Sequence, residues 1–302
     1  MFTIRRIEIA CDGEYKSRRI RGYLHLYDGQ EAIAAGTEAA LTRDDDWITS
    51  YRCHGAAFVR GCTPVQIFSE LFGRSPGTSR GKGGSMHMYR KQSNFYGGAA
   101  IVGAQVPIGA GLAFYHKYME EKKTCAIVFY GDGAANQGQC WETANMATLW
   151  KLPLIMVVEN NQYGMGTSVE RSSALTEYYK QGGEIIPGIQ VNGMDSLAVK
   201  ACIVAAKDYV TSSNGPCIVE AECYRYHGHS MSDPGNTYRT RDEVAKIRAA
   251  RDPIELVKHR LIEANMSTAD ELKQIEREIR EEVTKALADA SEAKFPEVSH
   301  LL

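Results

Sequence analysis

The feature that most constrains the fold is a strand–helix–strand pattern in the middle of the chain. Apolar residues 124–130 predict a buried strand, and residues 136–150 predict a helix with one apolar face. The helix is expected to end at Leu152-Pro153, because proline cannot continue it, and a second apolar strand follows at 153–158. Two strands joined in this way run parallel in one sheet. The chain is therefore predicted to be an α/β protein with a mostly parallel central sheet flanked by helices.

Polar residues directly follow both of these strands. Asp132 lies between two glycines after the first strand, and Asn161 follows the second. Because ligands bind at the carboxyl ends of parallel strands, both side chains are expected to reach one crevice. Carboxylate and amide oxygens suit Mg²⁺, which usually takes further oxygens from a substrate phosphate. Either residue alone could be a helix cap or a turn residue, but the pair at this spacing predicts a metal-bound phosphate.

Periodic apolar residues predict further elements on either side of this unit. Helices are predicted at 1–16, 29–41, 103–119 and 195–211, and strands at 188–192 and 217–223. The helix at 103–119 is expected to be buried, and the strand at 217–223 to alternate apolar and polar residues. A helical segment covers about 241–302, where Thr268 and Glu271 form a capping-box pattern before the apolar stripe Leu272, Ile275, Ile279 and Val283. Residues 1–302 are predicted to form a single domain.

Composition excludes several classes of protein. The net charge is −2 and no basic excess is present, so nucleic acid is not an expected partner. The 8 cysteines contain no C-x-x-C pair, which predicts buried free thiols in a reducing compartment. No apolar run approaches the ~18 residues of a membrane span, so no membrane association is expected. The first residues resemble neither a signal peptide nor a transit peptide.

Several segments together resemble one enzyme family. Gly131-Asp132-Gly133 followed by Asn160-Asn161 is similar to the thiamine diphosphate signature. The chain also contains RCHGAAFVRG, GKGGSMHMY, ENNQYGMGTSVER and YRYHGHSMSDPG. With these segments the chain resembles the alpha subunits of pyruvate dehydrogenase, in the thiamine diphosphate-dependent 2-oxo acid dehydrogenase family, over nearly its whole length. The resemblance implies the thiamine diphosphate-binding fold, and the form of the last segment is that of mitochondrial matrix proteins of eukaryotes.

The resemblance also implies roles for individual residues. The Mg²⁺ ligands would be the side chains of Asp132 and Asn161 and the backbone carbonyl of Tyr163. His25 and His229 would be the catalytic histidines that move protons. The remaining cofactor contacts would be Tyr51, Arg52, Ala100, Val102, Gly133, Ala134 and Arg225, together with His229. Phosphorylation sites are expected at Ser230, Thr237 and Ser168. Arg90 and Ala100 differ from the residues that relatives often carry near the cofactor.

The implied reaction is the decarboxylation of pyruvate with thiamine diphosphate and Mg²⁺, and transfer of the acetyl group to the lipoyl domains of the dihydrolipoyl acetyltransferase. A beta subunit would complete the active site in an α₂β₂ heterotetramer, and a kinase and a phosphatase would regulate it. The alternatives are an alpha subunit for branched-chain 2-oxo acids or acetoin, and a catalytically degenerate alpha chain. A nicotinamide-dependent oxidoreductase is less compatible with the sequence, because Phe114 stands where the last glycine of that motif belongs.

Overall fold

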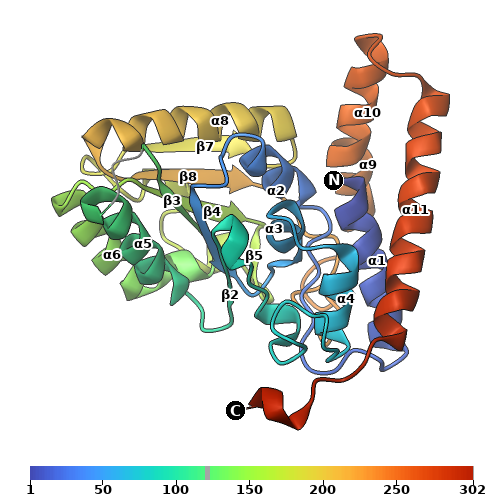
Figure 1. Cartoon of the computed structure of the whole chain (residues 1–302). Coiled ribbons are helices and arrows are strands. Elements are labelled where there is room, and N and C mark those ends of the chain that lie inside the picture. Colours follow the sequence, from blue (N-terminus) through green and yellow to red (C-terminus); the bar gives the residue numbers. More distant parts are fainter. Residues whose placement is uncertain (120–122, 302) are drawn as a thin grey trace.

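The centre of the molecule is a six-stranded parallel sheet. It is seen in a computed structural model that describes residues 1–119 and 123–301 (Figure 1). The strand order is β2-β1-β3-β4-β8-β7, and each neighbouring pair is parallel. These strands are β1 (Asp46–Ser50), β2 (Phe95–Ala99), β3 (Ala126–Gly131), β4 (Leu154–Asn160), β7 (Gly188–Asn192) and β8 (Cys217–Glu222). A short antiparallel pair, β5 (Tyr163–Gly164) and β6 (Thr167–Ser168), lies outside the sheet.

Helices flank this sheet, which confirms the predicted α/β class. In chain order they are α1 (Phe2–Lys16), α2 (Glu31–Glu38), α3 (His54–Val59), α4 (Pro64–Leu71), α5 (Gln105–Met119), α6 (Gly138–Leu149), α7 (Val169–Ser172), α8 (Ser196–Tyr209), α9 (Arg241–Arg251), α10 (Pro253–Glu263) and α11 (Ala269–Glu292). The predicted helices and strands all exist within a few residues of their expected bounds. None of the helices in the described part of the chain combines the length and apolar character needed to cross a bilayer.

The predicted strand–helix–strand unit is β3-α6-β4. Strands β3 and β4 are direct neighbours, with Gly131 paired to Glu159 in the register. Nearly every residue of both strands is buried, as expected for parallel strands that are covered on both faces. The polar residues that follow the two strands are therefore brought to the same edge of the sheet.

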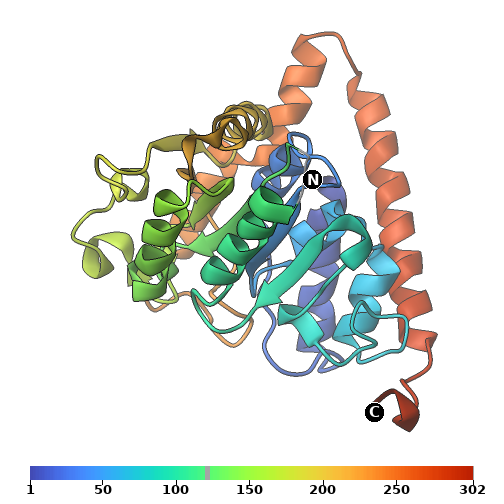
Figure 2. The ribbon, with the colours of Figure 1, turned by 60° about the vertical axis from the view of Figure 1, so that its left-hand side comes forward.

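Two hydrophobic cores lie on opposite faces of the sheet. Helices α5 and α6 cover one face, where Val106 and Ala144 pack with Val128. Figure 2 shows these two helices side by side. Gly109 lets α5 lie close to the sheet, because a Cβ there would lie 2.9 Å from the Cβ of Val128. The opposite core contains residues of α8 and α11, such as Ile203 and Val283.

Two details of the sequence-based prediction are wrong. Helix α5 is not buried all round, since Ile108, Tyr118 and Met119 are 53%, 53% and 71% exposed on its outer face. Strand β8 does not alternate between core and solvent, because it lies between β4 and β7 and is covered on both faces. Its Glu220 is fully buried and accepts hydrogen bonds from Asn160 Nδ2 at 2.7 Å and from the backbone N–H of Tyr179 at 3.1 Å.

The C-terminal helices form a long hairpin beside α1 (Figure 1). The predicted capping box is confirmed, with reciprocal hydrogen bonds between Thr268 and Glu271. The apolar stripe packs only in part: Val283 is buried and Ile279 contacts the core, but Ile275 is 48% exposed. The single domain stays a prediction. It is supported by Val283, which belongs to the same core as the sheet residues.

All eight cysteines are buried free thiols, as the sequence predicts. Burial raises the pKa of these thiols, for example that of Cys202 to about 11. Such thiols are protonated at neutral pH and serve as small packing residues rather than as nucleophiles.

Candidate active site

The segments that follow five parallel strands line one cavity of about 280 Å³. They follow β1, β2, β3, β4 and β8, so the cavity lies at the carboxyl ends of the strands, where α/β proteins bind ligands. Ten of the predicted site residues line it: Tyr51, Arg52, Val102, Asp132, Gly133, Ala134, Asn161, Tyr163, Arg225 and His229. The sheet thus gathers residues that are far apart in the sequence into one candidate active site.

Asp132 is a buried carboxylate with an unused oxygen. It is 1% exposed, and among the described residues its Oδ2 has no hydrogen-bond partner. Burial raises the pKa of Asp132 to about 6, although backbone hydrogen bonds and Arg225 act in the opposite direction. Gly133 and Gly164 approach each other beside it, since a Cβ on Gly133 would lie 3.3 Å from the Cα of Gly164. An unpaired buried carboxylate is costly to the fold and fits a cation ligand.

The other two oxygens predicted to bind metal face a cation of the protein itself. Arg225 donates from Nη1 to Asn161 Oδ1 at 3.2 Å and to the carbonyl oxygen of Tyr163 at 2.6 Å. Carboxylate, amide and backbone carbonyl oxygens are the hard donors that Mg²⁺ takes. The oxygen donors of Asp132, Asn161 and Tyr163 therefore fit this ion. In the structure Arg225 donates hydrogen bonds to two of these three oxygens.

The cavity also holds two guanidinium groups, those of Arg52 and Arg225, which bond to neutral acceptors. Both guanidinium groups are buried. Arg52 donates to the carbonyl oxygens of Leu26, at 2.6 Å, and His229, at 2.9 Å. Arg225 likewise bonds to neutral acceptors, which include the hydroxyl of Tyr238 at 2.9 Å. Because buried guanidinium groups favour an anionic partner, the cavity is suited to a phosphorylated ligand.

Two histidines stand together beside this charge. The ring of His25 lies 4.4 Å from that of Tyr51 and 5.3 Å from that of His229, measured between centroids. His229 lines the cavity, and His25 lies behind it. Burial, followed by the charge of Arg52, lowers the pKa of His25 to about 2 and that of His229 to about 3. Both imidazoles are therefore neutral at physiological pH.

The remaining predicted residues lie outside the cavity lining. Ala100 is half-buried and precedes the lining residue Val102. Ser230 is 5% exposed and its hydroxyl bonds to that of Ser232 at 2.8 Å. Thr237 is exposed and Ser168 is half-buried. Their predicted roles in binding and phosphorylation stay predictions.

Arg90, expected to lie near the cofactor, also points elsewhere. Its guanidinium donates to Gln66 Oε1 at 3.3 Å and lies beside Gly61. It is not one of the residues that line the cavity.

Sequence reasoning missed several lining residues, among them Gln30, Gln105 and Glu159. Glu159 is buried, and burial raises its pKa to about 7, against the hydrogen bonds from Tyr27 and Gln30 and the charge of Arg52. Its position was a usable signal, because an acid that ends a buried strand directly before Asn160-Asn161 must find polar partners. Gln30 carries no comparable local signal.

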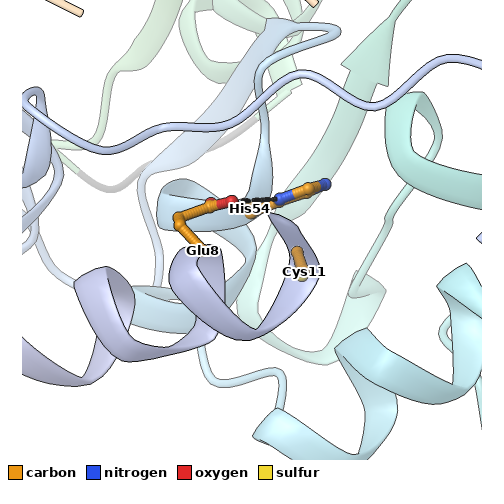
Figure 3. Close-up of side chains that lie close together, drawn as sticks. All are labelled: Glu8, Cys11 and His54. Carbon is orange, nitrogen blue, oxygen red and sulfur yellow. Dashed lines mark hydrogen bonds and ion pairs between the residues drawn. The ribbon is translucent and has the colours of Figure 1, made fainter. Parts of the chain in front are cut away.

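A second cluster of potential metal ligands lies away from the cavity. Glu8, Cys11 and His54 come from α1 and α3, and their ligand atoms lie within 4.8 Å of one another (Figure 3). Both ring nitrogens of His54 are already used: Nδ1 donates to Glu8 Oε1 at 3.0 Å, and Nε2 accepts from the hydroxyl of Ser85 at 2.9 Å. The cluster is interpreted as a structural tie between the two helices and the loop that carries Ser85.

The fold and the cavity are those of an α/β protein whose candidate ligand site lies at the carboxyl ends of its strands. The chain belongs to the dehydrogenase E1 component family, whose model matches residues 1–299. Enzymes of this family depend on thiamine diphosphate. The membership predicted from the sequence is confirmed.

Curated relatives cover essentially the whole chain. The pyruvate dehydrogenase E1 component subunit alpha-1 of Oryza sativa subsp. japonica is 55% identical over 301 residues, which are 100% of this chain and 76% of that protein. The corresponding alpha subunit of Schizosaccharomyces pombe is 57% identical, over 98% of this chain and 72% of its own length. A probable pyruvate dehydrogenase alpha subunit of Caenorhabditis elegans is 52% identical, over 99% of this chain and 76% of its own length. All three are named mitochondrial, which agrees with the predicted mitochondrial type.

Proposed function

We propose that this chain acts as the alpha subunit of a mitochondrial pyruvate dehydrogenase that uses thiamine diphosphate and Mg²⁺. The reaction would be oxidative decarboxylation of pyruvate with reductive acetylation of a lipoyl group of the acyltransferase core. Carbon dioxide would leave, and the lipoyl disulfide would be reduced as it takes up the remaining two carbons as an acetyl group. The single observation that carries the proposal is the cavity itself. It combines a buried carboxylate with an unused oxygen, Asp132, and two buried guanidinium groups, Arg52 and Arg225, at the carboxyl ends of the strands.

The protein residues would share the work of binding. Asp132, Asn161 and the carbonyl of Tyr163 would hold Mg²⁺, and Arg52 and Arg225 would neutralise the diphosphate. Arg225 Nη1 bonds to two of the three metal ligands, so loading with metal requires it to release them. Gly133 and Ala134 would lie beside the diphosphate, and Val102 beside the organic ring.

The bound cofactor supplies the electron sink that decarboxylation of a 2-oxo acid needs. The two histidines supply proton transfer. Burial and the charge of Arg52 lower the pKa of His25 and His229, so both rings are neutral and weakly basic in the free chain. The negative charge of a bound diphosphate and 2-oxo acid would raise these pKa values, so that a free ring nitrogen could then accept a proton and return it. The Nδ1 atoms of both rings have no partner among the described residues and remain available for such a transfer.

An exposed apolar face supports assembly with a beta subunit. Helices α5 and α6 lie side by side (Figures 1 and 2) and share this face. Its exposed members are Ile108, Phe114, Tyr115, Tyr118, Met119, Trp141, Met146 and Leu149. Clusters of exposed aromatic and aliphatic side chains mark protein interfaces. The proposal includes a heterotetramer of two alpha and two beta subunits, which presents its active site to the lipoyl domains.

Regulation by a kinase and a phosphatase would act on Ser230, Thr237 and Ser168. The phosphorylation proposal is supported by the position of Ser230, one residue after the cavity residue His229. Because Ser230 is almost fully buried, its segment must open before a kinase can reach the hydroxyl. A phosphate there would add nearly two negative charges beside the entrance to the cavity.

The function is tested with the chain co-expressed with its beta subunit. Calorimetric titration is expected to show binding of thiamine diphosphate that requires Mg²⁺, and Asp132→Ala is expected to abolish it with an unchanged circular dichroism spectrum. Turnover is then compared between pyruvate and 3-methyl-2-oxobutanoate. Preference for the branched acid would overturn the substrate assignment, and unchanged cofactor affinity in the Asp132 variant would overturn the site.

A further inference from the structure

The orientation of one amide decides whether the proposed metal site has its second ligand. The side chain of Asn161 can present either its oxygen or its NH₂ group to the cavity. Only the oxygen can bind a metal ion. In the structure Asn161 Oδ1 faces the cavity, where it accepts from Arg225 Nη1 at 3.2 Å. Something must therefore hold the amide in this orientation.

A hydrogen-bonded relay of three buried side chains, Glu159, Gln30 and Asn161, holds the amide in this orientation. Glu159 Oε1 accepts from Gln30 Nε2 at 3.2 Å and also from the hydroxyl of Tyr27 at 2.8 Å. The other end of the Gln30 amide, Oε1, accepts from Asn161 Nδ2 at 3.2 Å. Gln30, Glu159 and Asn161 line the cavity but are each 7% exposed or less, so these bonds are largely shielded from bulk water.

The direction of this chain follows from the carboxylate. Because Glu159 Oε1 accepts from both Tyr27 and Gln30, the Gln30 amide is turned with its NH₂ group towards Glu159. The Gln30 oxygen then faces Asn161, which has to donate, and the Asn161 oxygen is left for the cavity. We propose that Glu159 is a positioning residue that acts through Gln30 to turn the Asn161 oxygen towards the metal ion. This inference rests on the proposed function, because it assumes that metal binds at Asn161.

The neighbouring amide offers an internal comparison. Asn160 Nδ2 also donates to a buried carboxylate, Glu220, at 2.7 Å, but its Oδ1 accepts from the backbone N–H of Gln162 at 3.1 Å. Asn160 therefore uses its oxygen inside the protein, whereas Asn161 offers its oxygen to the cavity. The same change at Glu220 is thus a matched control for a change at Glu159.

The test uses the α/β complex, with Mn²⁺ as the probe in the presence of thiamine diphosphate at pH 8. Glu159→Gln keeps the shape of the side chain but adds a donor, so the chain can reverse and turn the Asn161 NH₂ group to the metal. We expect Mn²⁺ affinity, measured by electron paramagnetic resonance, to fall by about 10- to 100-fold, with a changed hyperfine pattern. Glu220→Gln is expected to leave both unchanged.

Rescue separates positioning from a merely structural effect. The double exchange Glu159→Gln with Gln30→Glu puts the carboxylate in the middle of the chain, where it accepts from both sides. Asn161 must again donate, so this variant is expected to recover Mn²⁺ affinity to within about 3-fold of the wild type. Gln30→Met, which interrupts the chain without touching Glu159, is expected to weaken binding as Glu159→Gln does.

Several results would overturn the inference. One is a Mn²⁺ affinity of Glu159→Gln that lies within 2-fold of the wild-type affinity. Another is a double variant that binds Mn²⁺ no more tightly than Glu159→Gln alone. If Glu159→Gln does not fold, Gln30→Met with unchanged affinity decides against the relay. Failure of the proposed function looks different, because the wild-type complex itself would then bind no Mn²⁺ in the presence of the cofactor.

Discussion

Two groups of buried charges in this molecule are treated in opposite ways. Between the helices, Arg5 bonds to both Glu31 and Asp252, so each charge has an ionic partner. In the cavity, Arg52 and Arg225 bond to neutral acceptors, and Asp132 keeps an unused oxygen. The first arrangement is complete without any ligand, and the second is not. Buried charge that is paired within the chain thus marks structure, and buried charge left for a partner marks a binding site.

The paired group ties three helices together. Arg5 lies on α1, Glu31 begins α2, and Asp252 is the N-cap of α10. Arg5 donates from Nη2 to Glu31 Oε2 and from Nη1 to Asp252 Oδ2, both at 3.0 Å. Burial alone would lower the pKa of Arg5, but its two acidic partners outweigh burial and raise it. The arginine is therefore fully charged, and its removal would leave two acids behind.

The largest loss of stability is expected when Arg5 is replaced. Arg5→Met leaves Glu31 buried without its cation and Asp252 with only Arg248, whose Nε lies 3.8 Å away, so the free energy of unfolding should fall by about 3–5 kcal/mol. Urea unfolding followed by circular dichroism measures this. Lys16→Met, which removes the exposed partner of Asp12, should cost less than about 1 kcal/mol. A loss at Arg5 no larger than this control would remove the contrast between the two groups.

Replacement of Asp132 is expected to change the free energy of unfolding in the opposite direction, towards higher stability. Its pKa of about 6 lies above its ordinary value of 3.8, so the ionised group destabilises the metal-free fold above pH 6. Asp132→Asn should therefore raise the free energy of unfolding at pH 8 by up to about 3 kcal/mol. The gain should shrink as the pH falls from 6 to 4. Urea unfolding curves in the presence of a chelator measure this gain, and Asp289→Asn on the surface of α11 is the control. A loss of stability of Asp132→Asn at pH 8 would contradict the view that Asp132 is a buried, unpaired carboxylate.

A third effect concerns the unpaired arginines. Arg52→Met removes a buried charge near the diphosphate and should weaken thiamine diphosphate binding by about 10- to 100-fold. The same change relieves the repulsion that, after burial, lowers the pKa of His229, so that pKa should rise from about 3. Calorimetry and nuclear magnetic resonance of histidine-labelled protein measure the two changes. The exposed Arg43→Met should alter neither, and cofactor affinity unchanged in Arg52→Met would show that this charge serves the fold alone.

The smallest change in stability is expected on breaking the ion pair between Asp28, before α2, and His227, after β8. Burial alone would lower the pKa of His227, but Asp28 Oδ2, at 2.7 Å from Nδ1, outweighs burial and raises it. The pair therefore stabilises the fold below about pH 6.5, and this contribution is lost as the pH rises through the raised pKa. Because the histidine is partly exposed, Asp28→Asn should flatten this pH dependence by less than about 1 kcal/mol. Melting temperatures between pH 5 and 8 measure it, and an unchanged slope would contradict it.

The centre of this fold and of its site could be predicted because the signals are local. Two apolar runs and a proline define the β3-α6-β4 unit, and Asp132 and Asn161 follow its strands directly. Strand β1 was missed because it has only five residues and follows the charged run Arg43 to Asp46. The contact between Gln30 and Glu159 was also missed, since it joins residues that lie far apart in the chain and depends on how the layers pack.

The exposed face of α5 shows the same limit. Small residues such as Gly109 predict close packing on one side of the helix, and this packing is confirmed. The whole helix was expected to be buried, but the aromatic residues on its other side, such as Phe114, are exposed. A sequence does not distinguish an apolar surface that is covered by its own chain from one that is left for a partner.

The pairing of the first long helix with the last has a consequence for how the chain is made. Helix α1 packs along α11, which lies more than 250 residues later in the sequence. During synthesis the face of α1 that packs on α11 therefore emerges long before that partner exists. Such a segment is a natural binding site for a chaperone on the ribosome. Helix α11 could then displace the chaperone from this face of α1 only once its own residues have been synthesised.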